Sequence, residues 1–355
     1  MVRCVRAGEL PAAVGESAMV PPILPPQGVR LQVESVWKRY GGGGGLWSRL
    51  RRASGLAPPA LAGVSMDVRA GEIVALVGES GSGKSTLARV IAGLEQASAG
   101  AVLVDGVDVS ALPPRRRPQA QLRAVQIVFQ NPDRTLNPSH RVGHILARAL
   151  RKGSGVAGAE RDERIAGLLA RVSLPPETGA QWPHALSGGQ RQRVAIARAL
   201  AGEPELVLAD EPVSALDVSV QGAIVNLLLD ERNQLGTSIL FISHDLALVH
   251  AISDRVVVLR RGKVMEAGPR DAVFAAPHHP YTRTLLSAAG AARDWPAQAQ
   301  TAQGVPAATG CVHANQCRQR IGPVCWQVEP APRDVAPGHS IACHRSVAEL
   351  VAEPD

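Results

Sequence analysis

The sequence predicts an α/β protein whose mostly parallel β-sheet is covered by helices on both faces. Three apolar runs have the length of buried strands: "LVLAD" (206–210), "SILFIS" (238–243) and "RVVVLR" (255–260). Helical patterns near residues 190–201 and 219–233 alternate with them. This alternation builds parallel sheets, because each crossover between parallel strands uses a helix. With 45% hydrophobic and 19% charged residues among 355, the chain also has the composition of a packed core.

The flanking segments predict three regions along the chain. Residues 1–28, rich in Pro, Ala and Gly, predict a disordered lead. We assign residues 29–270 to the main domain. After about residue 290 the composition becomes rich in Ala, Gln and Pro, and a small Cys-rich segment follows, so we assign residues 271–355 to a C-terminal extension. Within the main domain, residues 60–78 predict a hairpin that runs into a buried strand.

Composition limits the class of protein. No apolar run approaches the roughly 20 residues of a membrane helix, and the first residues lack the apolar region of a signal peptide. We therefore expect a cytosolic protein. The net charge of +7 fits an arginine-rich composition, or else contact with acidic membrane surfaces or nucleic acid. With only three Phe and two Tyr, the stacking platforms of single-strand binders are excluded.

A phosphate-binding loop is the strongest motif. The run "VGESGSGKST" (77–86) contains G-x-x-x-x-G-K-[ST] between an apolar strand and an amphipathic helix, which is the context this motif requires. Its glycines let backbone N–H groups surround a β-phosphate, Lys84 places a charge between β and γ oxygens, and Ser85 is a ligand for Mg²⁺. The alternative is a glycine-rich turn that binds nothing. Only four of the 38 basic residues in this sequence are lysines, so chance would rarely place a lysine at the motif position.

Acidic residues at a second strand end complete the predicted chemistry. "ELVLADEP" (205–212) places Asp210 where a carboxylate can hold the Mg²⁺ water shell, and Glu211 where it can polarise an attacking water. Gln130 in "IVFQNP" is a candidate for contact with both Mg²⁺ and that water. His244 in "FISHD" is a candidate hydrogen-bond donor to the γ-phosphate, or an ordinary surface histidine. Tyr40 can stack on adenine, or pack at a strand end.

A second helix start also attracts anions. In "HALSGGQRQRVAIARAL" (184–200), a Ser-Gly-Gly turn precedes a helix and leaves its first N–H groups open. One chain therefore carries two phosphate-seeking helix ends.

These motifs, in this order over residues 30–290, resemble the nucleotide-binding subunit of ATP-binding-cassette (ABC) transporters. "LSGGQ" (186–190) is similar to the family signature, "SALD" (214–217) to its D-loop and "SHD" (243–245) to its switch histidine. The resemblance implies a P-loop NTPase cassette with a RecA-like core, an antiparallel β subdomain and a helical signature subdomain. It also implies two cassettes packed head to tail, with the signature turn of one covering the ATP in the cradle of the other. Two anion sites on one chain are then halves of two composite sites.

The resemblance assigns the candidate residues as follows. The catalytic candidates are Glu211, His244, Gln130 and Lys84. The nucleotide-binding candidates are Tyr40, Gly78, Glu79, Ser80, Gly81, Ser82, Gly83, Lys84, Ser85, Thr86, Ser187, Gly188, Gly189, Gln190 and Asp217, the last of which helps to fix the dimer contact. The Mg²⁺ candidates are Ser85, Gln130 and Asp210.

Several stretches are similar to one branch of the family, the ATPases of bacterial dipeptide and oligopeptide importers. They are "DEPVSALDVSVQ" (210–221), "QNPDRTLNP" (130–138), "HPYTRTLL" (279–286) and the cysteine pattern of the tail (310–344). The implied partners are a second cassette, identical or paralogous, two membrane permeases and indirectly an extracytoplasmic binding protein, at the cytoplasmic face of the inner membrane. Nickel or glutathione import is the alternative within this branch. A soluble ABC ATPase acting on DNA or ribosomes, or a regulatory module that holds ATP without hydrolysing it, is the alternative outside transport.

Four of the five cysteines lie in the tail, at Cys311, Cys317, Cys325 and Cys343. Because a reducing cytosol disfavours disulfides, four gathered thiols suit a [4Fe–4S] cluster or Zn²⁺. The spacings lack the paired C-x₂-C of zinc ribbons, which favours iron–sulfur, and the resembled importer ATPases carry a cluster in this tail. Zinc, with His313, His339 or His344 as substitute ligands, and free thiols packed in a small hydrophobic tail are the alternatives.

Overall fold

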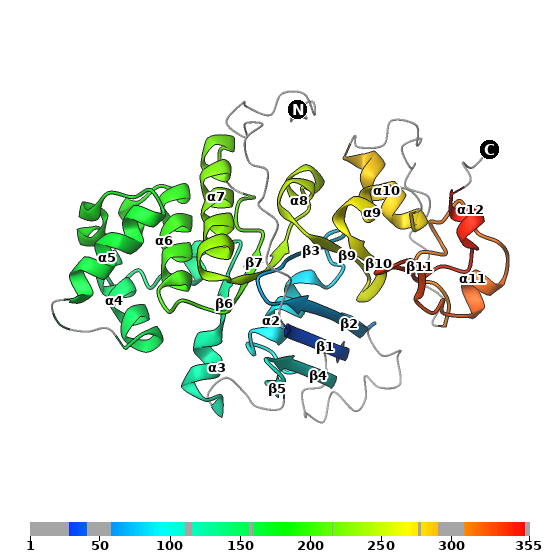
Figure 1. Cartoon of the computed structure of the whole chain (residues 1–355), viewed down its shortest axis with the longest axis horizontal. Helices are drawn as coiled ribbons and strands as arrows, with labels where there is room; N and C mark the ends of the chain where they lie inside the picture. Colours follow the sequence, from blue (N-terminus) through cyan, green and yellow to red (C-terminus); the bar gives the residue numbers. More distant parts are fainter. Residues whose placement is uncertain are drawn as a thin grey trace, which may run out of the picture.

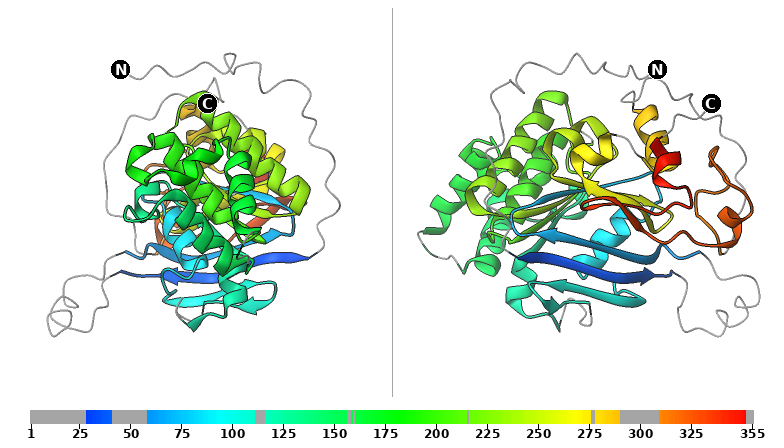
Figure 2. Two further views of the ribbon diagram at one scale, coloured as in Figure 1. Left: turned by 90° about the vertical axis from the view of Figure 1, so that its left-hand side faces the viewer. Right: turned by 45° about the vertical axis from the view of Figure 1, so that its right-hand side comes forward.

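Two β-sheets form the framework of the computed structural model, which describes residues 28–40, 58–110, 116–155, 158, 160–214, 216–275, 278–289 and 309–351. The smaller sheet is antiparallel, with the order β2-β1-β4-β5. Its strands are β1 (Val29–Lys38), β2 (Leu61–Arg69), β4 (Ala99–Val104) and β5 (Val107–Asp108). It lies as a separate layer beside the larger sheet (Figures 1 and 2). The predicted lead lies outside the described residues, apart from Gly28.

The larger sheet has the order β11-β12-β10-β9-β3-β8-β7-β6. Its strands are β3 (Ile73–Val77), β6 (Val125–Val128), β7 (Leu206–Asp210), β8 (Ser238–Ile242), β9 (Arg255–Arg260), β10 (Lys263–Pro269), β11 (Arg333–Ala336) and β12 (His339–Ile341). The pairs β6–β7, β7–β8, β8–β3 and β3–β9 are parallel, which confirms the predicted parallel sheet. Every residue of β3, β7 and β8 is buried, because helices or the second sheet cover both faces.

Helices make up most of the remaining regular structure in the described residues. The helices are α2 (Lys84–Ile91), α3 (Gln119–Ala124), α4 (Val142–Gly153), α5 (Glu160–Arg171), α6 (Gly188–Leu200), α7 (Val218–Leu235), α8 (Leu246–Ile252), α9 (Arg270–Phe274), α10 (Pro280–Ala288), α11 (Val324–Gln327) and α12 (Val347–Val351). Short 3₁₀ turns occupy Pro132–Arg134, Pro176–Ala180 and Pro183–Ala185.

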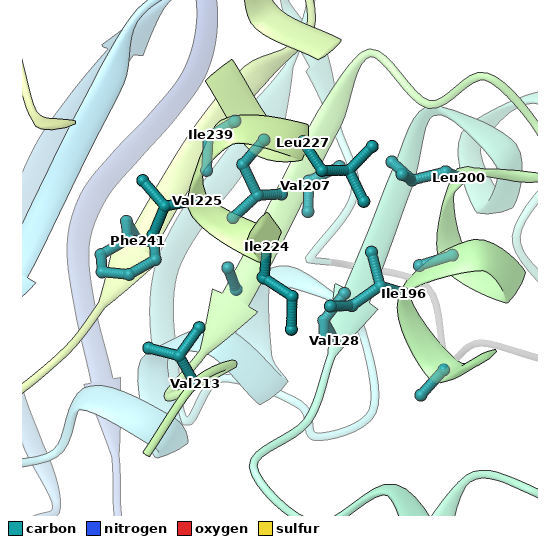
Figure 3. Close-up of a cluster of buried hydrophobic side chains, with 14 of the residues drawn as sticks. Val128, Ile196, Leu200, Val207, Val213, Ile224, Val225, Leu227, Ile239 and Phe241 are labelled. Atoms are coloured by element: carbon teal, nitrogen blue, oxygen red, sulfur yellow. The ribbon is translucent and has the colours of Figure 1, made fainter. Parts of the chain in front are cut away.

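Alternate residues of β3 belong to two different cores. Val74 and Leu76 join α2 and the antiparallel sheet in one cluster. Ile73, Ala75 and Val77 join α6, α7 and α8 in the other. Figure 3 shows this second core, with side chains of α7 lying among those of β7, β8 and α6. Period-2 alternation in β3 thus fixes α2 and α7 on opposite faces.

The helices α4, α5 and α6 gather at one end of the molecule (Figure 1). On α4 the buried residues are Val142, Ile145, Leu146 and Leu150, an apolar stripe with helical spacing. This unit is the helical subdomain that the resemblance implied, and α6 connects it to β7.

The predicted hairpin over 60–78 is wrong. β2 pairs with β1 in the smaller sheet, whereas β3 pairs with β8 and β9 in the larger one. Local bonds hold the chain as it changes sheets, since Glu72 accepts from the N–H of Arg69 (2.8 Å) and Ser238 Oγ accepts from the N–H of Gly71 (3.0 Å). A fully apolar strand needs cover on both of its faces, which a two-stranded hairpin alone does not supply.

The cysteine-bearing tail adds to the larger sheet. β12 pairs antiparallel with β10 through Glu266↔Ile341 and Ala267↔Ser340, and β11 extends the edge. The tail therefore shares hydrogen bonds with the main domain.

Candidate functional site

The phosphate-binding loop lies between β3 and α2, and two of its glycines fit only because they lack a side chain. Gly78 has φ 149°, and a Cβ there would lie 2.1 Å from the carbonyl oxygen of Leu259. Gly83 has φ 108°, and its Cβ would lie 2.6 Å from the carbonyl oxygen of Ala60. Between them, residues 79–81 are exposed. The loop is thus fixed at both ends while its middle is open to solvent.

Lys84 folds over this loop. Its Nζ donates to the carbonyl oxygens of Gly78 (2.7 Å) and Glu79 (2.9 Å). Burial lowers the pKa of Lys84, and the carboxylates of Glu211 and Asp210 oppose that shift. The ammonium therefore lies at the loop, with two carboxylates close enough to favour its charge.

The two predicted Mg²⁺ ligands from different elements are in contact. Ser85 Oγ donates to Asp210 Oδ1 over 3.0 Å, which joins the start of α2 to the end of β7. Asp210 is 4% exposed, and burial raises its pKa while the hydrogen bond from Ser85 lowers it. A hydroxyl and a carboxylate are oxygen donors of the kind Mg²⁺ accepts, so this pair fits that ion. Among the described residues, no group of three or more His, Cys, Asp or Glu is placed to hold a metal ion.

Three neighbouring strands deliver the remaining polar residues to one edge. Glu211, directly after β7, accepts from Gln130 Nε2, which follows β6, at Oε2 (2.8 Å). Its Oε1 lies 3.4 Å from Nδ1 of His244, which follows β8. Because β6, β7 and β8 are parallel neighbours, their carboxyl ends coincide. Glu211 also has φ 48°, a conformation disfavoured for non-glycine residues and often found at functional sites.

A cavity of about 550 Å³ opens beside these residues. Ser85, Gln130, Asp210 and Glu211 line it. Among the lining residues that sequence reasoning missed are the polar residues Arg89, Asn131 and Arg191. Arg191 joins the two sides of the cavity, because its guanidinium pairs with Asp133 (Nε–Oδ1 2.9 Å) and donates to the carbonyl of Leu186 (2.7 Å). Arg191 follows the "LSGGQ" run directly, and no signal in the sequence distinguished it from other surface arginines.

Tyr40 lies at the rim of the phosphate-binding loop. Its hydroxyl donates to Glu95 Oε2 (2.5 Å) and lies 3.4 Å from Thr86 Oγ1. The residue is 50% exposed, and Lys38 Nζ lies 5.2 Å from the centre of its ring. The predicted packing and the predicted stacking are both compatible with a ring fixed at its hydroxyl end and open elsewhere.

The signature turn is a helix start that remains accessible. Ser187 caps α6 and forms a capping box with Gln190, in which each side chain bonds the backbone N–H of the other. Leu186 is buried, whereas Ser187 and Gly188 are exposed and Gly189 is half-buried. Asp217 is exposed at the start of α7 and makes no capping hydrogen bond with its side chain. The turn is thus not enclosed by its own chain.

Comparisons with known proteins decide the family. Residues 61–214 match the family described as "ABC transporter", and residues 265–325 match "Oligopeptide/dipeptide transporter, C-terminal region". Dipeptide transport ATP-binding protein DppF of Escherichia coli K12 is 42% identical over 293 residues, covering 80% of this chain and 86% of DppF. The chain belongs to the ATP-binding subunits of ABC transporters. A Brucella ovis protein, named provisionally as a peptide import ATP-binding protein, is 46% identical over 289 residues, covering 79% of this chain and 90% of that protein.

Solved ABC cassettes have the same fold. A dimeric ATP-binding cassette in a post-hydrolysis state, bound to ADP and Pi, matches with a TM-score of 0.60 and 29% identity, covering 68% of this chain and 98% of that one. The cbiO1 protein of Clostridium perfringens, described as part of an ABC transporter complex, matches with a TM-score of 0.58 and 29% identity, covering 70% and 91%. The fold class predicted from the motifs is therefore confirmed. In the described part of this ABC subunit, no helix has both the length and the apolar character needed to cross a bilayer.

The extension of this ABC subunit brings its four cysteines to one small cavity of about 20 Å³. It is lined by Cys311, Cys317, Cys325 and Cys343 together with His279, His313 and His344. Burial raises the pKa of the Cys317 thiol to about 12, with Cys343, Cys311 and Cys325 adding to the shift. All four are free thiols. His339 lies apart from this cavity in a buried pair with Glu266 (Nε2–Oε1 2.7 Å).

Proposed function

We propose that this ABC subunit hydrolyses Mg·ATP to drive a bacterial importer of dipeptides or oligopeptides. The observation that carries the proposal is the convergence of the phosphate-binding loop with the carboxyl ends of β6, β7 and β8. There Ser85 contacts Asp210, and Glu211 contacts Gln130 and lies near His244.

Each residue has a defined task in this chemistry. Backbone N–H groups of the loop after Glu79 bind the β-phosphate, and Lys84 neutralises charge between the β and γ oxygens. Ser85, Asp210 and Gln130 would hold Mg²⁺, which would offset charge on the phosphates. Glu211 polarises a water for in-line attack on the γ-phosphate, and His244 donates to that phosphate as charge develops. Tyr40 stacks on the adenine.

The accessible signature turn supports a head-to-tail dimer. Ser187, Gly188 and Gly189 of one subunit donate to the γ-phosphate in the partner subunit's site, and Asp217 contributes to the contact. A solved relative of this fold is itself a dimer with ADP and Pi. ATP then joins the two cassettes, and hydrolysis removes the shared charge and releases them. This cycle moves two permeases, with the subunit peripheral to the cytoplasmic face of the inner membrane.

The peptide substrate class rests on the relatives and on the extension. DppF is named for dipeptide transport, and residues 265–325 match the C-terminal region of oligopeptide and dipeptide transporters. We keep 29–270 as the ATPase domain and 271–355 as the importer-type extension. Reconstitution with two permease subunits of a peptide importer tests this proposal. Peptide-stimulated ATP hydrolysis is the expected result, and stimulation by nickel or glutathione instead would assign the alternative cargo.

We also propose that the four cysteines of the extension hold a [4Fe–4S] cluster. Their convergence on one cavity supports this, and so does their donor chemistry. The four irons of a [4Fe–4S] cluster each bind one cysteine, so the cysteine sulfurs lie farther apart than the sulfurs around a single metal ion. Four cysteines that hold such a cluster therefore do not form a single-ion site. Anaerobically purified protein is expected to contain iron and to absorb near 400 nm. Zinc without iron would favour the zinc alternative, and neither metal would favour free thiols.

A further inference from the structure

A buried tyrosine of the extension contacts the phosphate-binding loop directly. Tyr281 lies on α10 within "HPYTRTLL" (279–286), and it is fully buried. Its hydroxyl oxygen accepts a hydrogen bond from the backbone N–H of Glu79 over 2.9 Å. Glu79 is the second residue of the loop, 202 positions earlier in the chain. The roles proposed above for ATP hydrolysis make no use of Tyr281.

Arg260 holds the same loop residue by its side chain. It lies at the end of β9 and is 3% exposed. One guanidinium nitrogen pairs with Glu79 Oε1 at 3.1 Å, and the guanidinium carbon lies 4.2 Å from the centre of the Tyr281 ring. A second nitrogen donates to Gln316 in the cysteine-bearing tail. Arg260 therefore joins three segments, which are the loop, α10 and the tail.

Glu79 is thus held at three points, and the third is the catalytic lysine. Tyr281 binds its N–H, Arg260 binds its carboxylate, and its carbonyl oxygen accepts from Lys84 Nζ over 2.9 Å. The peptide groups on either side of Glu79 cannot rotate without breaking one of these bonds. A continuous series of contacts therefore runs from the tail through Tyr281 and Glu79 to Lys84.

We propose that Tyr281 and Arg260 are positioning residues for the phosphate-binding loop, through which the extension sets the affinity of the subunit for ATP. The inference rests on the proposed ATP hydrolysis but adds residues outside the cassette motifs. Fixed N–H groups bind phosphate without a cost of ordering the loop. Because the β-phosphate is held in the ground state and in the transition state alike, loosening the loop weakens both equally. Such a loss raises KM and leaves kcat nearly unchanged.

Tyr281→Phe tests this inference, since it removes only the hydroxyl and keeps the ring against Arg260. The expected result is a rise of about fivefold in KM for ATP, the factor that corresponds to one hydrogen bond of average strength, with kcat within about twofold of wild type. The matched control is Ser287→Ala, on the same helix, whose hydroxyl donates to the carbonyl of Arg283 in its own helix (2.8 Å). Its KM and kcat are expected to equal those of wild type.

A second measurement separates positioning from general stability. The dissociation constant of a fluorescent ATP analogue is measured in the full chains of Tyr281→Phe, Arg260→Lys and Ser287→Ala, at a temperature where circular dichroism shows all three to be folded. Weaker binding in Tyr281→Phe and partial weakening in Arg260→Lys, with unchanged binding in Ser287→Ala, support the inference. An unchanged KM in folded Tyr281→Phe, a loss of kcat with KM unchanged, or the same rise in Ser287→Ala would overturn it. If the wild-type chain hydrolyses no ATP, the proposed function fails instead, and the binding measurement still tests the inference.

Discussion

Replacing Glu211 by Gln tests the chemistry assigned to the edge of the parallel sheet. The change keeps the shape of the side chain, and the new amide oxygen can still accept from Gln130, which now donates to Oε2 over 2.8 Å. Only the negative charge near His244, 3.4 Å away, is lost. We therefore expect an intact fold and intact ATP binding. Removal of a general base costs about 10² to 10⁴ in rate, so kcat is expected to fall by that factor while KM changes by less than about threefold.

The assay for Glu211→Gln measures steady-state phosphate release and ATP-dependent dimerisation by size-exclusion chromatography. With ATP, the Glu211→Gln subunits are expected to stay dimeric. The bound triphosphate joins the two cassettes, and its charge leaves the shared site only when ATP is hydrolysed. Glu203→Gln is the matched control, since Glu203 is an exposed acid that also has a positive φ (49°). Its turnover is expected to equal that of wild type. Turnover within tenfold of wild type in Glu211→Gln would refute the assignment of Glu211 as the base.

Three further predictions follow from contacts in the structure. Gly78→Ala places a methyl group 2.1 Å from the carbonyl oxygen of Leu259. It is therefore expected to lower the free energy of unfolding by about 3 kcal/mol in urea titrations and to abolish ATP binding. Retained ATP binding would contradict the loop geometry. Ser187→Ala removes a cap of α6, which is expected to cost about 1 kcal/mol of stability and to lower the ATP-dependent dimer fraction. Burial, with the charges of Arg283 and His339, lowers the pKa of His278 to about 4. Between about pH 4 and the ordinary histidine pKa of about 6.5, this side chain is therefore protonated in the unfolded chain and neutral in the folded one. The free energy of unfolding consequently falls as the pH falls through that range. His278→Gln is therefore expected to reduce by about 2 kcal/mol the loss of unfolding free energy between pH 7.5 and pH 5, measured in urea, and an unchanged loss would exclude His278 as its source.

Local pattern was sufficient for the elements that carry the motifs. The fully apolar runs before Gly78 and Asp210 are the buried strands β3 and β7, and the expected helix after Lys84 begins at that residue. The motifs also assigned Ser85 and Asp210 to the same Mg²⁺ ion, and the structure brings these residues, 125 positions apart, into contact at one edge of the parallel sheet. The roles assigned to these residues stay predictions.

Local pattern failed where the choice of neighbour was decided far away in the chain. The segment 60–78 has the alternation and the turn of a hairpin, yet β2 and β3 enter different sheets because β3 requires β8 and β9 beside it. The tail gave no sign that β12 would pair with β10. Arg191 looked like any other arginine, although it joins the signature turn to Asp133.

The sequence by itself determined the family, the phosphate-binding loop and the alternation of strand and helix, because these depend on residue type at short spacing. Only the tertiary structure decided that Tyr281 and Arg260 reach Glu79 from the far end of the chain. The physical reason is that a hydrogen bond between a buried hydroxyl and a backbone N–H leaves no periodic trace in sequence. It exists only once the sheet has brought α10 beside the loop.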